Sequence, residues 1–171
     1  TITLVTVEKF SEAMDKFIAG ECDIVTTDGS ALVGRRAVND ALNDWSIFPT
    51  SPISKEPLGP VYRSNDSMWG DVINWVVYAT IIADEYGVTS ANVDSVDTDA
   101  LPELGRLFGA NDGELQTVMG LSADAFYNVI KQVGNYDEIY SRNLNPVGLF
   151  REGGANDRWT NGGLIYAPPA R

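Results

Sequence analysis

Apolar residues recur with helical spacing near the start of the chain, over residues 8–19. One face of this predicted helix collects the apolar positions i, i+3, i+4, i+7 and i+8, namely Phe10, Ala13, Met14, Phe17 and Ile18. Runs rich in β-formers, Ile2–Val7 and Asp23–Thr27, flank it, and a second helix is expected from about Ser30 to Asn39. This strand–helix–strand–helix order predicts a parallel βαβ unit and an α/β fold.

The second region of the chain begins after a proline-spaced stretch. Four prolines between residues 48 and 61 exclude a helix there and predict an extended crossing between two regions. A strand over Leu58–Arg63 should lead into a long helix that Asp66 or Ser67 caps and Gly87 ends. Shorter helices are then expected over 91–95, 102–108, 114–119, 123–133 and 135–143. The tail from Asn145 onward is rich in Gly, Pro and Asn, so we expect it to wrap a surface rather than form a core.

Composition excludes several classes of function. The chain has 171 residues with 24 acidic and 12 basic side chains, a net charge of −12, no histidine and one cysteine. An acidic chain repels phosphate backbones, which argues against nucleic-acid binding. The missing histidine removes the commonest metal ligand and general base, so no metal, cofactor or Cys/His catalysis is expected.

Specific catalytic motifs are also missing from the sequence. It contains no glycine-rich phosphate loop, serine-hydrolase elbow or zinc-protease motif. A carboxylate pair for glycoside hydrolysis is chemically conceivable, but nothing in the sequence singles out a pair. No apolar run reaches the roughly 18–20 residues of a membrane span. These observations favour a binding protein over an enzyme.

The stretch from Ala19 to Leu32 contains the strongest candidate for a binding residue. It predicts a helix end, a short buried strand, Asp28 at the carboxyl end of that strand, and a new helix. Ligands of open α/β sheets bind in the crevice outside these strand ends. Asp28 is therefore placed to meet a cationic group, with hydroxyls of Thr27 and Ser30 beside it. The alternative is that Asp28 only caps the following helix, because aspartate is a favoured N-cap residue.

The single cysteine, Cys22, lies in the same predicted strand. One interpretation is a buried free thiol that packs as a small apolar side chain. The other is a disulfide to a polypeptide outside this sequence, because an odd cysteine in a secreted protein suggests a missing mate. The residues alone leave both open.

Four segments carry a resemblance to a known family: AGECDIVTTDGSAL (19–32), ISKEPLGPVYR (53–63), IKQVGNYDEIYSRNL (130–144) and RWTNGGLIYAPPAR (158–171). They resemble the periplasmic general L-amino-acid-binding proteins of ABC transporters, of the solute-binding protein family 3 type, in order and over essentially the whole chain. The resemblance implies a two-lobed Venus-flytrap fold, each lobe a sheet flanked by helices. Its lobes close on the ligand by a hinge. It further implies no enzyme activity, a periplasmic location, a free L-amino acid as ligand and a membrane permease as partner.

The resemblance also divides the chain. Residues 1–50 match the latter part of the second lobe, 51–57 the hinge crossing, and 58–171 the closing portion of the first lobe. The family's amino-terminal half, which contains the arginine that clamps the ligand α-carboxylate, has no counterpart here. We therefore expect a companion polypeptide that carries this half, because a sheet without it exposes unpaired edges.

Residue by residue, the resemblance implies roles for the candidates named above. Asp28 matches the family's acidic residue that binds the ligand α-ammonium, and Thr27 and Ser30 adjoin it. Cys22 matches one member of a disulfide whose mate lies on the missing segment. The competing function is a ligand-sensing extracytoplasmic receptor domain of the same fold.

Overall fold

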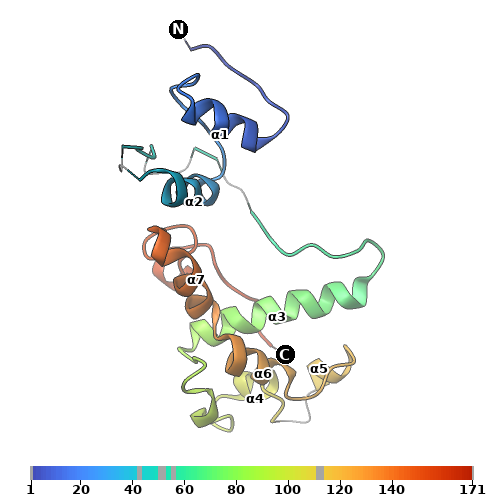
Figure 1. The fold of residues 1–171 in the computed structure, drawn as a ribbon. Helices are drawn as coiled ribbons and strands as arrows, with labels where there is room; N and C mark the ends of the chain where they lie inside the picture. The colour runs from blue at the N-terminus through green and yellow to red at the C-terminus, as the bar shows by residue number, and fades with distance from the viewer. Residues whose placement is uncertain (1, 42–43, 50–52, 55–56, 111–113, 171) are drawn as a thin grey trace. The chain divides into compact units, whose positions relative to one another are not determined.

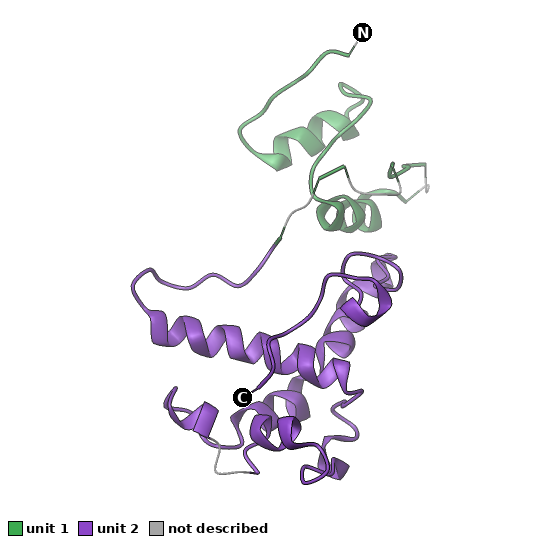
Figure 2. Ribbon diagram, turned by 180° about the vertical axis from the view of Figure 1, so that it is seen from behind, with its two compact units in different colours: residues 1–57 green, residues 58–171 purple. Residues whose placement is uncertain are grey.

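The computed structural model describes residues 2–41, 44–49, 53–54, 57–110 and 114–170. The chain divides into two compact units, Thr1–Pro57 and Leu58–Arg171, which Figure 2 colours separately. The regular elements of the described residues are helical, and the one β-pairing among them is an isolated parallel bridge between Arg158 and Ile165. Most of the crossing predicted at residues 51–57 lies outside the described residues.

Unit 1 is built on two helices, α1 (Phe10–Ile18) and α2 (Gly29–Asn39). On the predicted apolar face of α1, Met14 is buried, and the Phe17 ring meets the Trp45 ring edge-to-face at 5.0 Å. From α2, Val33 is buried and the Arg35 guanidinium lies 5.8 Å from the centre of the Phe10 ring. Both helices are confirmed, with ends shifted by a residue or two.

The two strands predicted in unit 1 are not confirmed. Residues 2–7 and 23–27 lack strand pairing with any described residue. Their apolar side chains face solvent: Ile2 is 93% exposed, Leu4 81% and Ile24 64%. The burial expected of the second strand is therefore wrong. A strand needs a neighbour's N–H and C=O groups, and the described residues provide none.

Unit 2 is organised around the long helix α3 (Ser67–Glu85). As predicted, Asp66 caps it, its carboxylate accepting a hydrogen bond from the Trp69 N–H at 3.2 Å. Gly87, with a φ of +67°, follows its last turn. Helices α6 (Ala125–Val133) and α7 (Tyr136–Leu144) pack against α3 (Figure 1). The remaining elements are η1 (Val93–Ser95), α4 (Pro102–Leu107), α5 (Glu114–Thr117), α6 (Ala125–Val133), α7 (Tyr136–Leu144), η2 (Asn145–Val147) and η3 (Trp159–Asn161).

The core of unit 2 joins α3, α4 and α6. Its buried members are Ala79, Ile82, Ala83, Val88, Val93, Leu104, Leu107, Phe108, Phe126, Ile130 and Ala170. The last of these corrects a prediction about the tail, because Ala170 is fully buried. Its N–H donates to Glu103 at 2.9 Å, and its carbonyl accepts from Arg106 Nε at 2.7 Å. The tail thus contributes to the core instead of only covering it.

Helix α3 is the longest of the described helices. None of them, α3 included, combines the length and hydropathy needed to cross a bilayer. The apolar stretch of α3 instead supplies Ala79, Ile82 and Ala83 to the core. This burial accounts for its hydrophobic sequence.

Candidate ligand-binding site

Asp28 occupies the N-cap position of α2, with a φ of −54° and a ψ of 141°. Its backbone carbonyl accepts the hydrogen bond from the Leu32 N–H at 3.0 Å, but its side chain makes no capping hydrogen bond. The side chain also forms no ion pair with another described residue. Capping by the carboxylate, the alternative to ligand binding, is therefore not observed. A half-buried carboxylate at a helix start is left available.

The other two predicted binding residues lie next to Asp28 in the chain. Thr27 is half-buried just before the helix, and Ser30 is exposed in the first turn of α2. No hydrogen bond joins these side chains to one another or to Asp28 among the described residues. Thr27, Asp28 and Ser30 lie at the same end of α2 because they are close in sequence. No hydrogen bond among their side chains adds to this proximity.

Cys22 lies in the irregular segment between α1 and α2. It is half-buried and free, so it is less buried than the strand prediction implied. As the chain's only cysteine it has no intrachain mate. A disulfide with another segment stays a prediction.

Unit 2 contains a buried polar cluster that was not predicted from the sequence. The Asp84 carboxylate, near the end of α3, is fully buried and accepts hydrogen bonds from two arginines of the tail. Arg151 Nη2 lies 2.5 Å from its Oδ2, and Arg158 Nη2 lies 2.6 Å from its Oδ1. Arg151 also reaches Asp137 at 3.1 Å and stacks on the Tyr136 ring, 4.9 Å from its centre.

This cluster borders a small polar cavity of about 180 Å³. A carboxylate at its wall, Asp157, accepts hydrogen bonds from the N–H of Gly153, the side chain of Asn161 and the N–H of Arg158. These donors lower the pKa of Asp157, so its carboxylate stays ionised at a more acidic pH than an ordinary aspartate. Both arginines already face carboxylates. The cluster is therefore suited to anchoring the tail, not to binding an anion.

A signal for this cluster exists in the sequence. Asp84 directly follows Ile81, Ile82 and Ala83, so a charge falls within an apolar helical run. Charged side chains are almost never fully buried without a partner. Such a position therefore indicates a buried arginine or lysine elsewhere in the chain, although it does not say which one.

Comparisons with known proteins address the function. No family model matches the chain. The glutamate/glutamine/aspartate/asparagine-binding protein of Rhodobacter capsulatus is 43% identical over 175 residues, covering all of this chain and 51% of that protein. The general L-amino acid-binding periplasmic protein of Rhizobium johnstonii is 42% identical, covering 98% of this chain and 49% of its own length.

A solved structure gives the same result. A periplasmic binding protein of an ABC transporter from Brucella ovis, with glutathione bound, superimposes with a TM-score of 0.88 at 41% identity. The match covers 98% of this chain and 52% of the Brucella chain. The chain therefore has the fold of part of a periplasmic binding protein.

Its relatives define the class more narrowly, and they confirm the resemblance seen in the sequence. The chain is homologous to the amino-acid-binding periplasmic proteins of ABC transporters. These relatives are named as binding proteins and not as enzymes. The chain spans about half the length of the relatives it matches.

Proposed function

We propose that this chain forms part of an extracytoplasmic amino-acid-binding protein of an ABC transporter. Such a protein captures a free L-amino acid between two lobes and presents it to the membrane permease. The observation that carries the proposal is homology over practically the entire chain, at 42–43% identity, to two proteins named for amino-acid binding. The bound glutathione of the Brucella protein fits this class, since glutathione carries an α-amino acid group at one end.

Within this proposal, Asp28 binds the α-ammonium group of the ligand. The carboxylate is half-buried and lacks the capping hydrogen bond that its position would permit. A hydrogen bond between two charged groups is roughly twice as strong as a neutral one. Thr27 and Ser30 add hydroxyl groups that can complete the polar surround of the ammonium.

We further propose that residues 1–50 form the latter part of the second lobe, 51–57 the hinge crossing and 58–171 the closing portion of the first lobe. The division of the chain into compact units at Pro57 and Leu58 supports this assignment. A companion half then supplies the neighbouring strands and the group that binds the ligand α-carboxylate. The solvent-exposed Ile2, Leu4 and Ile24 support the need for such neighbours.

Calorimetric titration of the protein as its cells produce it tests this function. Glutamate, glutamine, aspartate, asparagine and a branched-chain amino acid are titrated in turn. We expect binding of at least one, and Asp28→Asn should weaken it about 10- to 100-fold, the size of a lost hydrogen bond to a charged group. Asp23→Asn, an exposed aspartate of the same segment, is the matched control and should leave affinity unchanged.

Two results would count against the proposal. Absence of binding to every amino acid in the wild-type protein overturns the function. Equal affinities of the Asp28→Asn and Asp23→Asn variants overturn the role of Asp28 alone.

Thiol labelling of the denatured protein tests the proposed disulfide at Cys22. If the disulfide is present, the Cys22 thiol becomes reactive only after reduction.

A further inference from the structure

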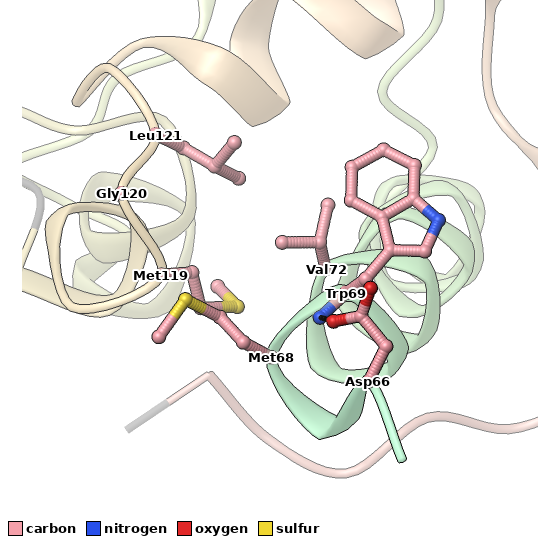
Figure 3. Close-up of a pocket in the computed structure, with 7 residues that line it drawn as sticks. All are labelled: Asp66, Met68, Trp69, Val72, Met119, Gly120 and Leu121. Carbon is pink, nitrogen blue, oxygen red and sulfur yellow. Dashed lines mark hydrogen bonds between the residues drawn. The ribbon is translucent and has the colours of Figure 1, made fainter. Parts of the chain in front are cut away.

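Two cavities of unit 2 differ in their chemistry. Met68 and Val72 of α3 face Met119 and Leu121 across the larger one, which is apolar and has a volume of about 350 Å³ (Figure 3). The smaller one, of about 180 Å³, is lined by three carboxylates and two guanidinium groups. The sixth residue at its wall is Asn161, whose side chain is a primary amide. This amide can be converted into a further carboxylate, so we consider its surroundings in detail.

Asn161 is followed by a glycine, a combination that favours reaction of the amide. Asn161–Gly162 is the only Asn–Gly pair in the 171-residue sequence. A glycine has no Cβ that would keep its backbone nitrogen away from the preceding side chain. Gly162 has a φ of +89°, and open space surrounds the position that a Cβ would take. Both residues are exposed, so water reaches the pair.

Deamidation of this pair needs only water as a co-reactant. The Gly162 backbone nitrogen attacks the side-chain carbonyl carbon of Asn161 and forms a bond to it. The bond between this carbon and the amide nitrogen breaks, and ammonia leaves with the proton of the attacking nitrogen. Water then opens the resulting cyclic succinimide at either carbonyl group, which gives aspartate or isoaspartate. Nothing is oxidised or reduced in these steps.

The fold holds both reacting groups in hydrogen bonds. The Asn161 side-chain amide donates to Asp157 Oδ1 at 3.1 Å, and Asp157 is only 7% exposed. The Gly162 N–H donates to the Trp159 carbonyl at 3.1 Å. Attack requires that the amide turns toward the Gly162 nitrogen and that this nitrogen gives up its proton. Both hydrogen bonds must therefore open before the reaction can begin.

Asn161 lies within a tightly closed loop, residues 155–165. The Ile165 N–H donates to the Asp157 carbonyl at 3.1 Å, which joins the two sides of the loop. The sides also touch, because a Cβ added at Gly163 would lie 1.9 Å from that carbonyl oxygen. Isoaspartate lengthens the backbone between these contacts by one carbon atom, and the closed loop has no room to absorb it.

Either product also places a second carboxylate beside Asp157. The donor at 3.1 Å is replaced by a negative charge, and two carboxylates this close disfavour each other's ionised form. The next residue, Arg158, holds Asp84 with its Nη2 atom 2.6 Å from Oδ1. A displacement of the loop therefore weakens a contact that anchors the tail to α3.

We propose that Asn161 is a deamidation site whose reaction is controlled by its hydrogen bond to Asp157, and that the modified residue loosens the loop 155–165 from α3. The reaction requires no enzyme, ligand or oxidant. The site does not depend on the proposed function, because it lies in unit 2 and involves none of the candidate ligand-binding residues.

Peptide mass spectrometry of the protein as its cells produce it tests the site. The protein is incubated at mildly alkaline pH, with and without urea, and is then cleaved with trypsin. Asn161 is recovered in peptide 159–171, and the control Asn156, which precedes an aspartate, in peptide 152–158. We expect the mass gain of an amide converted to an acid at Asn161 and not at Asn156. It should accumulate about 30-fold faster in urea, the effect of opening two hydrogen bonds.

Asp157→Ala tests the control by the hydrogen bond. The folded variant should deamidate about 5-fold faster than the folded wild type, because one of the two hydrogen bonds is lost, and the rates in urea should agree. Glu152→Ala, another carboxylate of the same cavity, is the matched control and should leave the rate unchanged. Circular dichroism verifies the fold of both variants. If Asp157→Ala does not fold, the wild-type rates with and without urea decide the question.

Asn161→Asp reproduces the charge of one product and tests the effect on the loop. Its midpoint of thermal unfolding should lie about 2–6 °C below that of the wild type, through a lost hydrogen bond and the added repulsion. Asn156→Asp introduces the same charge at an exposed position of the loop and should shift the midpoint by less than about 1 °C.

Three results would overturn the inference in its separate parts. A mass gain at Asn161 no larger than that at Asn156 in urea overturns the site. Equal rates in the folded and the unfolded wild type overturn the control by the hydrogen bond. Equal midpoints of the Asn161→Asp and Asn156→Asp variants overturn the effect on the loop.

Discussion

Asp84 and Arg151 lie 67 residues apart in sequence, but the Arg151 Nη2 atom lies 2.5 Å from the Asp84 Oδ2 atom. Asp84 is fully buried, and the Arg151 side chain is only 3% exposed. Removing a charge pair of this kind from water is expensive, and the geometry must compensate for it. Here Arg158 donates to the other oxygen of the Asp84 carboxylate. The Arg151 guanidinium also pairs with Asp137 and stacks on the Tyr136 ring, and these contacts compensate for the lost hydration. The pair holds the tail against the end of α3.

Replacement of Asp84 should therefore destabilise the protein strongly. Asp84→Asn removes the countercharge of a buried arginine, and breaking one partner of a buried pair costs about 3–5 kcal/mol. Urea unfolding followed by tryptophan fluorescence measures the loss. Asp71→Asn, at an exposed position of the same helix, should change stability by less than about 0.5 kcal/mol. Similar stabilities of the two variants would show that the cluster contributes little.

Gly109 should tolerate alanine less well than another glycine of the same backbone conformation. Its φ is +78°, and an added Cβ would lie 2.1 Å from the carbonyl oxygen of Ala123. Gly87 has a φ of +67° but open space around it. Gly87→Ala should cost about 1–2 kcal/mol for the left-handed backbone alone. Gly109→Ala should cost clearly more, because the backbone must also move; equal losses in thermal unfolding would exclude the clash.

Phe126 is the largest fully buried side chain of the core in unit 2. Phe126→Ala should lower the free energy of unfolding by about 3–5 kcal/mol, through lost apolar burial and the cavity left behind. Phe150, which is 65% exposed, provides the matched control. Phe150→Ala is expected to cost under about 1 kcal/mol. Chemical denaturation of both variants makes the comparison, and a small loss at Phe126 would contradict the observed packing.

Acid should remove the stability that Glu138 contributes. Burial raises the pKa of this carboxyl, but hydrogen bonds from Ser90 and from the Asn135 N–H outweigh it, so the pKa lies below its usual 4.5. A carboxyl whose pKa is lower in the folded than in the unfolded protein stabilises the fold at pH values above its unfolded-state pKa. This stabilisation is lost as the pH falls through the pKa of the folded state. Glu138 also completes the capping box of α7 with Asn135.

The matching variant is Glu138→Gln, which keeps one acceptor oxygen but loses the second. At pH 7 it should be less stable than the wild type by about 1–2 kcal/mol. This difference should shrink as the pH falls below about 4.5, the pKa of the carboxyl in the unfolded chain, and through the lower pKa of the folded protein. Glu152→Gln, at an exposed position, should show no such pH-dependent difference. A difference that stays constant down to pH 3 would exclude the carboxylate as its source.

Local signals in the sequence predict the helices well. The apolar periodicity around Met14, the Asp66 cap and the glycines at positions 20, 87 and 134 all mark helix faces or ends that the structure contains. Each depends on residues close in the chain, whose effect on the backbone is direct. The same holds for the placement of Asp28 at the start of α2.

Features that depend on distant residues could not be predicted in the same way. A strand exists only when a neighbour pairs with it, and the β-rich pattern of Ile2–Val7 does not reveal where that neighbour lies. The burial of Ala170 depends on Glu103 and Arg106, more than 60 residues earlier. The sequence could indicate that Asp84 needs a cation, but only the tertiary structure identifies Arg151 and Arg158.

The anchoring of the tail has a consequence for the order in which unit 2 folds. Asp84 gains its partners, and the core gains Ala170, only from residues 151–170. A folding intermediate that has formed α3 without these residues therefore still carries a carboxylate without its arginines and an incompletely covered apolar core. Such exposed apolar surface is what makes folding intermediates prone to aggregation.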